Sequence, residues 1–201
     1  MPVLTREEFD AIEFEATLTG DHEAAAERMN VLAVTGTQSE SMPRAEAFVR
    51  AGEQWLLADN PGAAANGFRM AIADGGPVDV DPRVSLCRAL FLLGHRDDAY
   101  AMIAKLRSEG RASARACDML TELLVEQSDL PAALDWATTG VELLLRDSGG
   151  SAGLGNDGWP GDDAHDAAAQ SGLRDLLRLR YRIRNDLRLP EDEYDKMLGS
   201  C

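Results

Sequence analysis

The sequence predicts an all-α fold, a solenoid of helix–turn–helix repeats with a C-terminal helix after a flexible linker. Apolar residues recur at helical spacing through most of the 201 residues, as on the buried face of an amphipathic helix. Alternating runs of β-branched residues, the usual sign of strands, are nearly absent. Similar turn sequences return every 34 to 39 residues, which is typical of a helical repeat array.

The first helix is expected to begin at Thr5, which can cap it while Glu8 reaches back in a capping box. Gly20 can end this helix in the left-handed conformation. Pro43 and Pro82 fit the first turns of later helices, where a missing N–H group costs nothing. The helices of the array are expected at about residues 5–19, 21–34, 43–58, 63–74, 82–93, 97–107, 112–126 and 130–146.

A small residue recurs near the start of the second helix of each pair. These residues are separated by 39, 35 and 34 positions and are Ala25, Ala64, Ala99 and Ala133. A small side chain lets two helices pack almost in contact, whereas a larger one would force them apart. The spacing therefore predicts four helix pairs of one design.

The second pair also places small and aromatic residues in a distinctive order, at Gly52, Trp55, Ala64, Phe68 and Ala71. With this order and spacing, residues 5–146 resemble the tetratricopeptide repeat (TPR) family. The fourth pair departs from the family pattern, with Ala137 where phenylalanine is usual. The resemblance implies a solenoid whose first helices line a concave groove.

Residues 147–164 interrupt the helical pattern with six glycines and no basic or β-branched residue. Ordering such a stretch costs much backbone entropy, so a flexible linker is expected. The predicted organisation is a repeat domain at 1–146, this linker, and a C-terminal region at 165–201. In that region a helix is expected over 166–188, followed by a short acidic turn over 191–198.

The chain has 35 acidic and 20 basic side chains, a net charge of -15, which argues against nucleic acid or anionic membrane as the main partner. Residues 173–188 are the exception, because six arginines and two aspartates give a net charge of +4. Three interpretations of this arginine-rich helix stay open. It could cap the last repeat, fold back into the groove as an internal ligand, or dock onto nucleic acid or an acidic protein.

Enzymatic and metal-binding signatures are weak. The pattern Gly153-x-Gly155-x-x-Gly158 lacks the strand before it and the helix after it that a dinucleotide site requires. The acidic residues near it have no EF-hand spacing, and His22 and His95 are expected in surface turns. The sequence predicts no catalytic residue, no metal ligand and no cofactor. The cysteines form no CxxC pair and no signal peptide is evident, so a cytoplasmic location is expected.

The resemblance places acidic and apolar residues along the groove. The candidate partner-binding residues are Phe14, Glu46, Val49, Glu53, Leu56, Arg88, Phe91, Asp118 and Glu122. Apolar anchors among carboxylates suit a basic or amphipathic segment of another protein. The sequence therefore predicts a non-enzymatic adaptor or scaffold. The alternative is a regulatory protein whose arginine-rich helix contacts nucleic acid or a regulatory partner.

Overall fold

The computed structural model describes residues 3–151 and 163–198. Within these residues the predicted all-α class is confirmed, with ten helices and no strand. Inside each compact unit the helices pack in sequence against their neighbours. An isolated β-bridge joins Val3 to Thr37. The chain divides into two compact units, residues 1–111 and 112–201.

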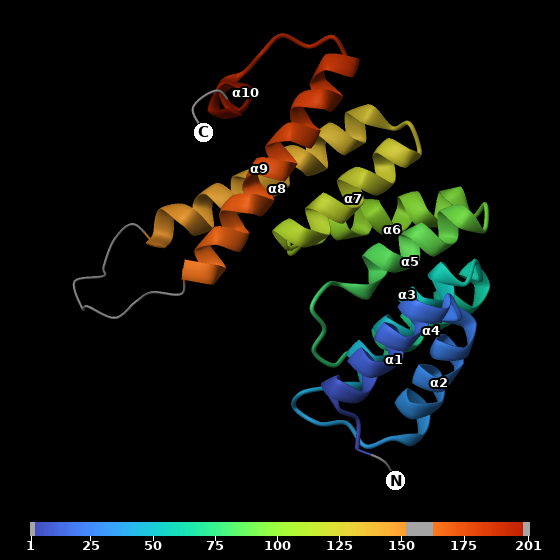
Figure 1. Cartoon of the computed structure of the whole chain (residues 1–201). Coiled ribbons are helices and arrows are strands. Elements are labelled where there is room, and N and C mark those ends of the chain that lie inside the picture. Colours follow the sequence, from blue (N-terminus) through green and yellow to red (C-terminus); the bar gives the residue numbers. More distant parts are fainter. Residues whose placement is uncertain (1–2, 152–162, 199–201) are drawn as a thin grey trace. The chain divides into compact units, whose positions relative to one another are not determined.

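Unit 1 consists of three consecutive helix pairs. Its helices are α1 (Arg6–Thr19), α2 (His22–Thr35), α3 (Arg44–Leu57), α4 (Pro61–Asp74), α5 (Pro82–Leu92) and α6 (Arg96–Glu109). Each packs against the next along the chain, and α1, α3 and α5 run in the same general direction (Figure 1). The sequence placed most of these helix ends correctly. Thr5 accepts the N–H of Glu8 at 3.3 Å, and Gly20 ends α1 with a left-handed φ of 75°.

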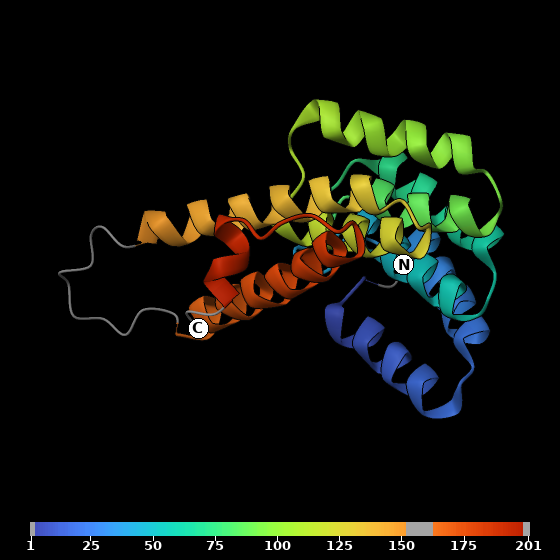
Figure 2. The same ribbon diagram turned by 90° about the horizontal axis from the view of Figure 1, so that it is seen from above.

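Unit 2 contains one further pair and a C-terminal hairpin. Its helices are α7 (Ala114–Glu126), α8 (Leu130–Ser151), α9 (Asp163–Asp186) and α10 (Glu193–Met197). Figures 1 and 2 show α8 and α9 side by side. The apolar face of α9 packs on α8, where Leu176 and Leu177 are buried with Ala137 and Val141. This packing favours the capping interpretation of the arginine-rich helix over the internal-ligand one, because its apolar side chains are already covered by α8.

The turn inside each of the four pairs has the same geometry, as the repeat spacing predicted. Each first helix is followed by a residue with left-handed φ: Gly20 (75°), Asp59 (56°), Gly94 (78°) and Ser128 (60°). Five positions later each pair buries its alanine, namely Ala25, Ala64, Ala99 and Ala133. The internal repeat in the sequence is therefore a repeat in the structure.

Helices α3 and α4 approach closely because of two glycines. A Cβ atom at Gly52 would lie 2.6 Å from the ring of Phe68, and one at Gly67 would lie 3.2 Å from the carbonyl oxygen of Phe48. Phe68 is fully buried at this contact. A larger residue at either glycine would push the two helices apart.

The sequence missed a fifth pair, which α9 and α10 form. At the end of α9, the N–H of Leu189 donates to the carbonyl of Arg184 at 3.0 Å, and Arg188 is left-handed with φ 56°. In this bond, the residue directly after the left-handed one donates its N–H to the carbonyl five residues earlier. The same bond ends α3, where the N–H of Asn60, which follows the left-handed Asp59, donates to the carbonyl of Trp55 at 2.9 Å. The second helix of this fifth pair is short, since α10 has 5 residues whereas α4 has 14.

The linker prediction was too long at both ends. Helix α8 continues to Ser151, five residues beyond the expected end, and α9 begins at Asp163. Extending an existing helix adds one hydrogen bond for each residue fixed, which offsets the entropy that the glycines cost. The glycine pattern at 153–158 lies outside the described residues.

Candidate functional site

Three of the predicted binding residues are not on the surface. Glu46, Val49 and Phe91 retain only 7%, 6% and 8% of their accessible area, so these three predicted residues are buried within the protein. Leu56 is half-buried, whereas Glu53 and Arg88 are exposed, each with an interaction inside the protein. Phe14 is 67% exposed.

Glu46 is buried because it holds a loop. Its carboxylate accepts the backbone N–H of Asp79 at 3.1 Å and so ties α3 to the connection between α4 and α5. Burial raises the pKa of Glu46, although the hydrogen bond from Asp79 and the charge of Arg50 act in the opposite direction. Its role in the structure is to position this loop.

Phe91 is buried because it forms the contact between α5 and α6. Its ring meets that of Tyr100 edge-on, with centroids 5.3 Å apart. The guanidinium of Arg96 lies over the Phe91 ring at 5.5 Å from its centroid. This stacking gives Phe91 a structural role within its helix pair.

The side chains that are exposed on the first helices include three leucines that the sequence analysis missed. Leu18, Leu57 and Leu92 are 71%, 61% and 59% exposed. Each lies four positions after a predicted residue and hence on the same side of its helix. We call these six residues, Phe14, Leu18, Glu53, Leu57, Arg88 and Leu92, the first-helix face. The predicted residues Leu56 and Phe91 precede Leu57 and Leu92 by one position, which is a rotation of about 100° around a helix.

The leucines of the first-helix face lie in the last turns of α1, α3 and α5, which run in the same direction (Figure 1). The last turn of each of these helices lacks a basic residue. The carbonyl groups at a helix C-terminus carry partial negative charge, which a cation nearby would offset. The three leucines therefore lie next to helix C-termini at which a positively charged group of a partner would be stabilised.

The hairpin of α1 and α2 makes this end of unit 1 strongly acidic. Residues 6–35 carry eight carboxylates and two arginines, a net charge of -6. Arg50 of α3 balances two of these carboxylates, since it lies 2.6 Å from both Asp10 and Glu13. Burial opposes the charge of Arg50, but its hydrogen bonds to Glu13 and Asp10 outweigh burial and raise its pKa above the ordinary value.

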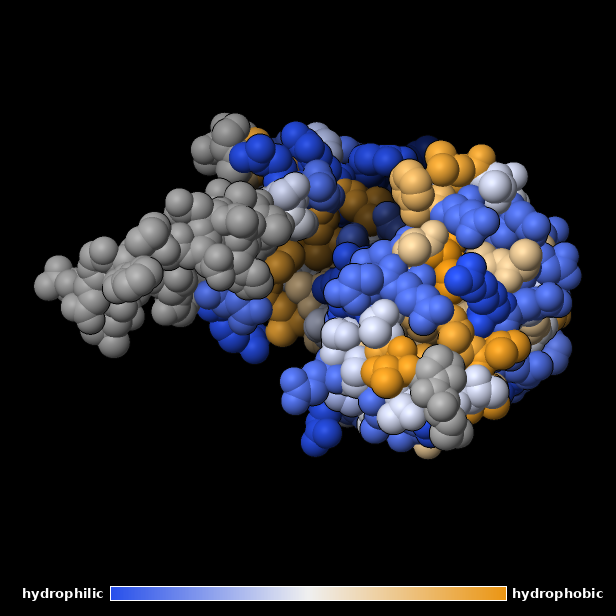
Figure 3. Space-filling view, turned by 60° about the horizontal axis from the view of Figure 1, so that its bottom comes forward, coloured by the Kyte–Doolittle hydropathy of each residue, from blue (hydrophilic) through white to orange (hydrophobic). Residues whose placement is uncertain are grey.

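Apolar surface also appears elsewhere on unit 1. Figure 3 shows patches of apolar residues separated by hydrophilic ones. Exposed apolar side chains outside the first-helix face include Val3, Val31, Val34, Met70 and Ile72. Single exposed apolar residues are common on soluble proteins, so the arrangement at equivalent helix ends is what sets the first-helix face apart.

Asp118 and Glu122 belong to α7 in unit 2. Asp118 is half-buried, and burial raises its pKa, as does the charge of Asp175, while Arg115 lowers it. Glu122 is exposed and interacts within the protein. Both side chains lie on the predicted helix, outside the unit that carries the first-helix face.

The described residues contain no cluster suited to a metal ion, and Cys87 and Cys117 are buried. Across residues 3–151 and 163–198, no group of three or more His, Cys, Asp or Glu side chains could hold a metal ion. Burial raises the pKa of the Cys87 thiol to about 12, so it stays protonated and unreactive. Among the described helices, none is both long and apolar enough to cross a membrane.

Comparison with known proteins adds no assignment to this surface. No model of a known protein family matches the chain, and a search of curated proteins found no significant match. The first-helix face must therefore be interpreted from its own chemistry.

Proposed function

We propose that the chain is a non-enzymatic protein–protein interaction module whose first-helix face binds a basic, amphipathic segment of another protein. The exposure of Phe14 and Leu18 on an acidic helix is the observation that carries this proposal. Both lie on the side of α1 opposite its buried residues Phe9, Ile12 and Ala16. They therefore do not stabilise the fold of unit 1 by packing in its core.

The apolar residues supply the affinity in this proposal. Burying a Phe or Leu side chain in an interface contributes about 1.5 to 3 kcal/mol relative to leaving it in water. Phe14, Leu18, Leu57 and Leu92 could together anchor a segment through side chains on one of its faces. The resemblance of residues 5–146 to the TPR family, with its groove of first helices, supports the same mode of binding.

The negative charge of the α1–α2 hairpin determines which kind of partner this surface favours. A second copy of the chain would bring another hairpin of net charge -6 against the first, and like charges in contact disfavour binding. Lysine or arginine on the partner would instead meet the carboxylates of α1 and the helix C-termini. A basic amphipathic segment thus fits this surface better than a second copy does.

Nucleic-acid binding by the arginine-rich helix is the less favoured alternative. Arg180 and Arg184 of α9 are paired with Asp192 and Asp195 inside unit 2, so two of the six arginines in residues 173–188 are already neutralised. The whole chain is strongly acidic, and this charge would repel a polyanion.

A peptide-binding experiment tests the proposal. The probes are two fluorescent helical peptides of equal length, one of leucine and lysine and one of leucine and glutamate, read by anisotropy. We expect the full chain to bind only the basic peptide, and Phe14→Ser with Leu18→Ser to weaken that binding by about tenfold or more. The control variant, Met70→Ser with Ile72→Ser on α4, removes two exposed apolar residues outside the first-helix face and should bind like the unaltered chain.

Two results would contradict the proposal. The first is equal binding of both peptides, which would show that charge selects nothing. The second is equal loss in the α1 and α4 variants, which would indicate nonspecific apolar adsorption.

A further inference from the structure

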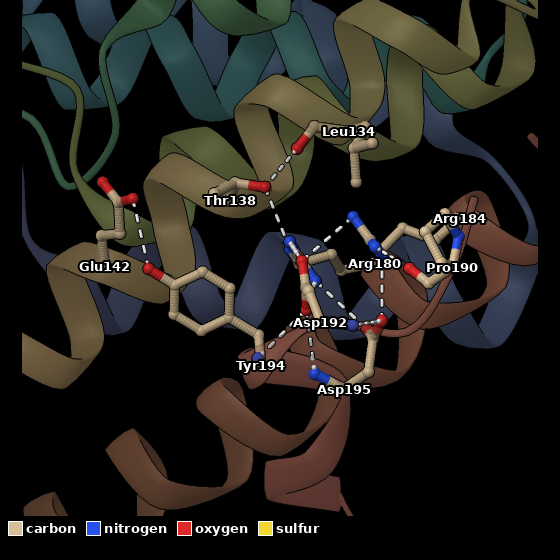
Figure 4. A network of polar contacts seen from close by, with 9 residues as sticks. All are labelled: Leu134, Thr138, Glu142, Arg180, Arg184, Pro190, Asp192, Tyr194 and Asp195. Carbon is tan, nitrogen blue, oxygen red and sulfur yellow. Dashed lines mark hydrogen bonds and ion pairs between the residues drawn. The ribbon is translucent and has the colours of Figure 1, made fainter.

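A buried ionic cluster fastens the C-terminal end of the chain to α9. We call it the C-terminal clasp; it consists of Arg180, Arg184, Asp192 and Asp195 (Figure 4). Arg180 donates to both carboxylates, at 3.1 Å to Asp195 Oδ1 and 3.1 Å to Asp192 Oδ1. Arg184 donates to Asp195 Oδ2 at 2.8 Å and to the carbonyl of Pro190. The guanidinium side chain of Arg180 is only 4% exposed.

Helix α8 supplies the other wall of this site. Thr138 accepts a hydrogen bond from Arg180 Nε at 3.0 Å, and the Tyr194 hydroxyl donates to Glu142 at 3.3 Å (Figure 4). The Tyr194 ring lies 4.7 Å from the Arg180 guanidinium. Beyond the clasp, Met197 and Leu198 pack on the apolar cluster of α8 and α9.

Helix α10 depends on these contacts for its position. It has only 5 residues, and a helix this short is unstable by itself in water. Its two clasp carboxylates also complete the capping box, since Asp192 accepts the N–H of Asp195 and Asp195 accepts the N–H of Asp192. The same two side chains therefore fold α10 and attach it.

The connection to α9 is short and strained. Arg188 adopts a left-handed φ of 56°, a conformation that costs a non-glycine residue free energy. In the fifth helix pair, α10 also occupies a position that 14-residue helices fill in other pairs. The second helix of this pair is therefore held on α8 and α9 by fewer residues than α4 or α6 offers in its own pair.

We propose that this surface of α8 and α9 is a docking site for an acidic helical segment of another protein, and that the chain's own residues 192–198 occupy it in competition. The partner segment would carry two carboxylates three positions apart, to pair with Arg180 and Arg184. Apolar side chains would lie between and after these carboxylates, as Tyr194, Met197 and Leu198 do here. The site is chemically opposite to the first-helix face and does not depend on it.

Tethering sets the strength of this competition. A segment joined by a short connection acts at an effective concentration of about millimolar. A free copy of the same segment at micromolar concentration would therefore be excluded almost completely from the unaltered chain. Weakening the tethered segment, without removing it, should open the site to an added peptide.

The experiment uses the full chain with Asp192→Asn and Asp195→Asn, because asparagine keeps the capping oxygen and removes the charge. The probe is a fluorescent peptide of residues 190–198 with both aspartates. We expect this variant to bind the peptide at least about tenfold more tightly than the unaltered chain. Adding Arg180→Met should abolish binding, and a peptide with asparagine at both positions should not bind.

The proposal is overturned if the variant binds no better than the unaltered chain, or if both peptides bind equally. A dimer of either chain by light scattering would also overturn it, because a second copy would then be the occupant. Should the variant lose its helical circular dichroism, Tyr194→Ala with Met197→Ala weakens the apolar end instead and must give the same gain. The chain with Phe14→Ser and Leu18→Ser should bind the 190–198 peptide as weakly as the unaltered chain does. A failed proposal for the first-helix face can therefore be distinguished from a failed proposal for the surface of α8 and α9.

Discussion

The guanidinium of Arg50 on α3 lies 2.6 Å from the carboxylate of Glu13 on α1. The pair joins two helices that are separated in sequence by α2, and Arg50 is almost completely buried there. The Arg50 guanidinium also lies 5.6 Å from the centroid of the Phe9 ring. This one side chain thus connects the acidic α1 to the core of unit 1.

Replacing Arg50 should destabilise unit 1. Arg50→Ala leaves Glu13 and Asp10 close together without a counter-charge, and we expect the free energy of unfolding to fall by about 2 kcal/mol. Arg28→Ala is the matched control, because Arg28 forms an exposed 3.8 Å pair with Glu15 and such pairs contribute little. Urea unfolding of both variants measures the difference; equal losses would contradict a special role for Arg50.

Two glycine substitutions in one helix pair should have different effects. At Gly52 an added methyl group would lie 2.6 Å from the Phe68 ring, so Gly52→Ala should cost about 1 to 3 kcal/mol through overpacking. At Gly62 the nearest atom would be 3.7 Å away, so Gly62→Ala should be neutral or stabilise α4 by up to about 1 kcal/mol. Thermal unfolding compares them, and a stable Gly52→Ala protein would argue against the close approach of α3 and α4.

Arg188→Gly should stabilise the chain. Arg188 has a left-handed φ of 56°, which glycine adopts without steric cost, so we expect a gain of about 1 kcal/mol. The same change at Arg178, inside α9, should instead cost about 1 kcal/mol of helix propensity. Opposite shifts in the urea midpoint would support the turn geometry, whereas destabilisation by both changes would not.

The clasp should lose stability in acid. Hydrogen bonding to Arg180 lowers the pKa of Asp192 from 3.8 to about 2. A carboxyl whose pKa is lower in the folded state stabilises it above the unfolded pKa, and this contribution disappears as pH falls from about 4 to about 2. The shift corresponds to about 2 kcal/mol.

Unfolding experiments over this pH range can isolate the contribution of Asp192. The Asp192→Asn chain should be less stable than the unaltered chain at neutral pH and should approach it near pH 2. A constant difference between the two chains at all pH values would exclude Asp192 as the titrating group. Because Glu46 has a raised pKa and titrates with the opposite sign, the comparison with Asp192→Asn is needed to separate the two.

Local signals in the sequence were sufficient for the fold class. Thr5 can cap a helix wherever it precedes one, and Gly20 can adopt a left-handed φ in any context. The recurrence of Ala25 and its counterparts revealed the pairs because close helix packing requires a small residue at a fixed place. These properties depend on neighbours in the chain, so they can be read without knowing the tertiary structure.

The candidate site was only partly predictable. Phe14 is exposed, whereas the predicted residues Leu56 and Phe91 are half-buried and buried, and the leucines that follow them, Leu57 and Leu92, are exposed. Adjacent apolar residues differ by about 100° around a helix, and both sides of α3 and α5 can look apolar when neighbouring helices cover them. Only the packing of those neighbours decides which leucine stays in water.

By itself, the sequence determined an acidic, all-helical chain built from repeated pairs, because periodicity, caps and charge are properties of the residues themselves. The tertiary structure decided which of those residues remain available. It buried Glu46 against a loop, turned Arg180 and Arg184 of the arginine-rich helix inward to Asp192 and Asp195, and left Phe14 and Leu18 exposed. The physical reason is that burial and pairing depend on side chains brought together from distant positions, which no local pattern encodes.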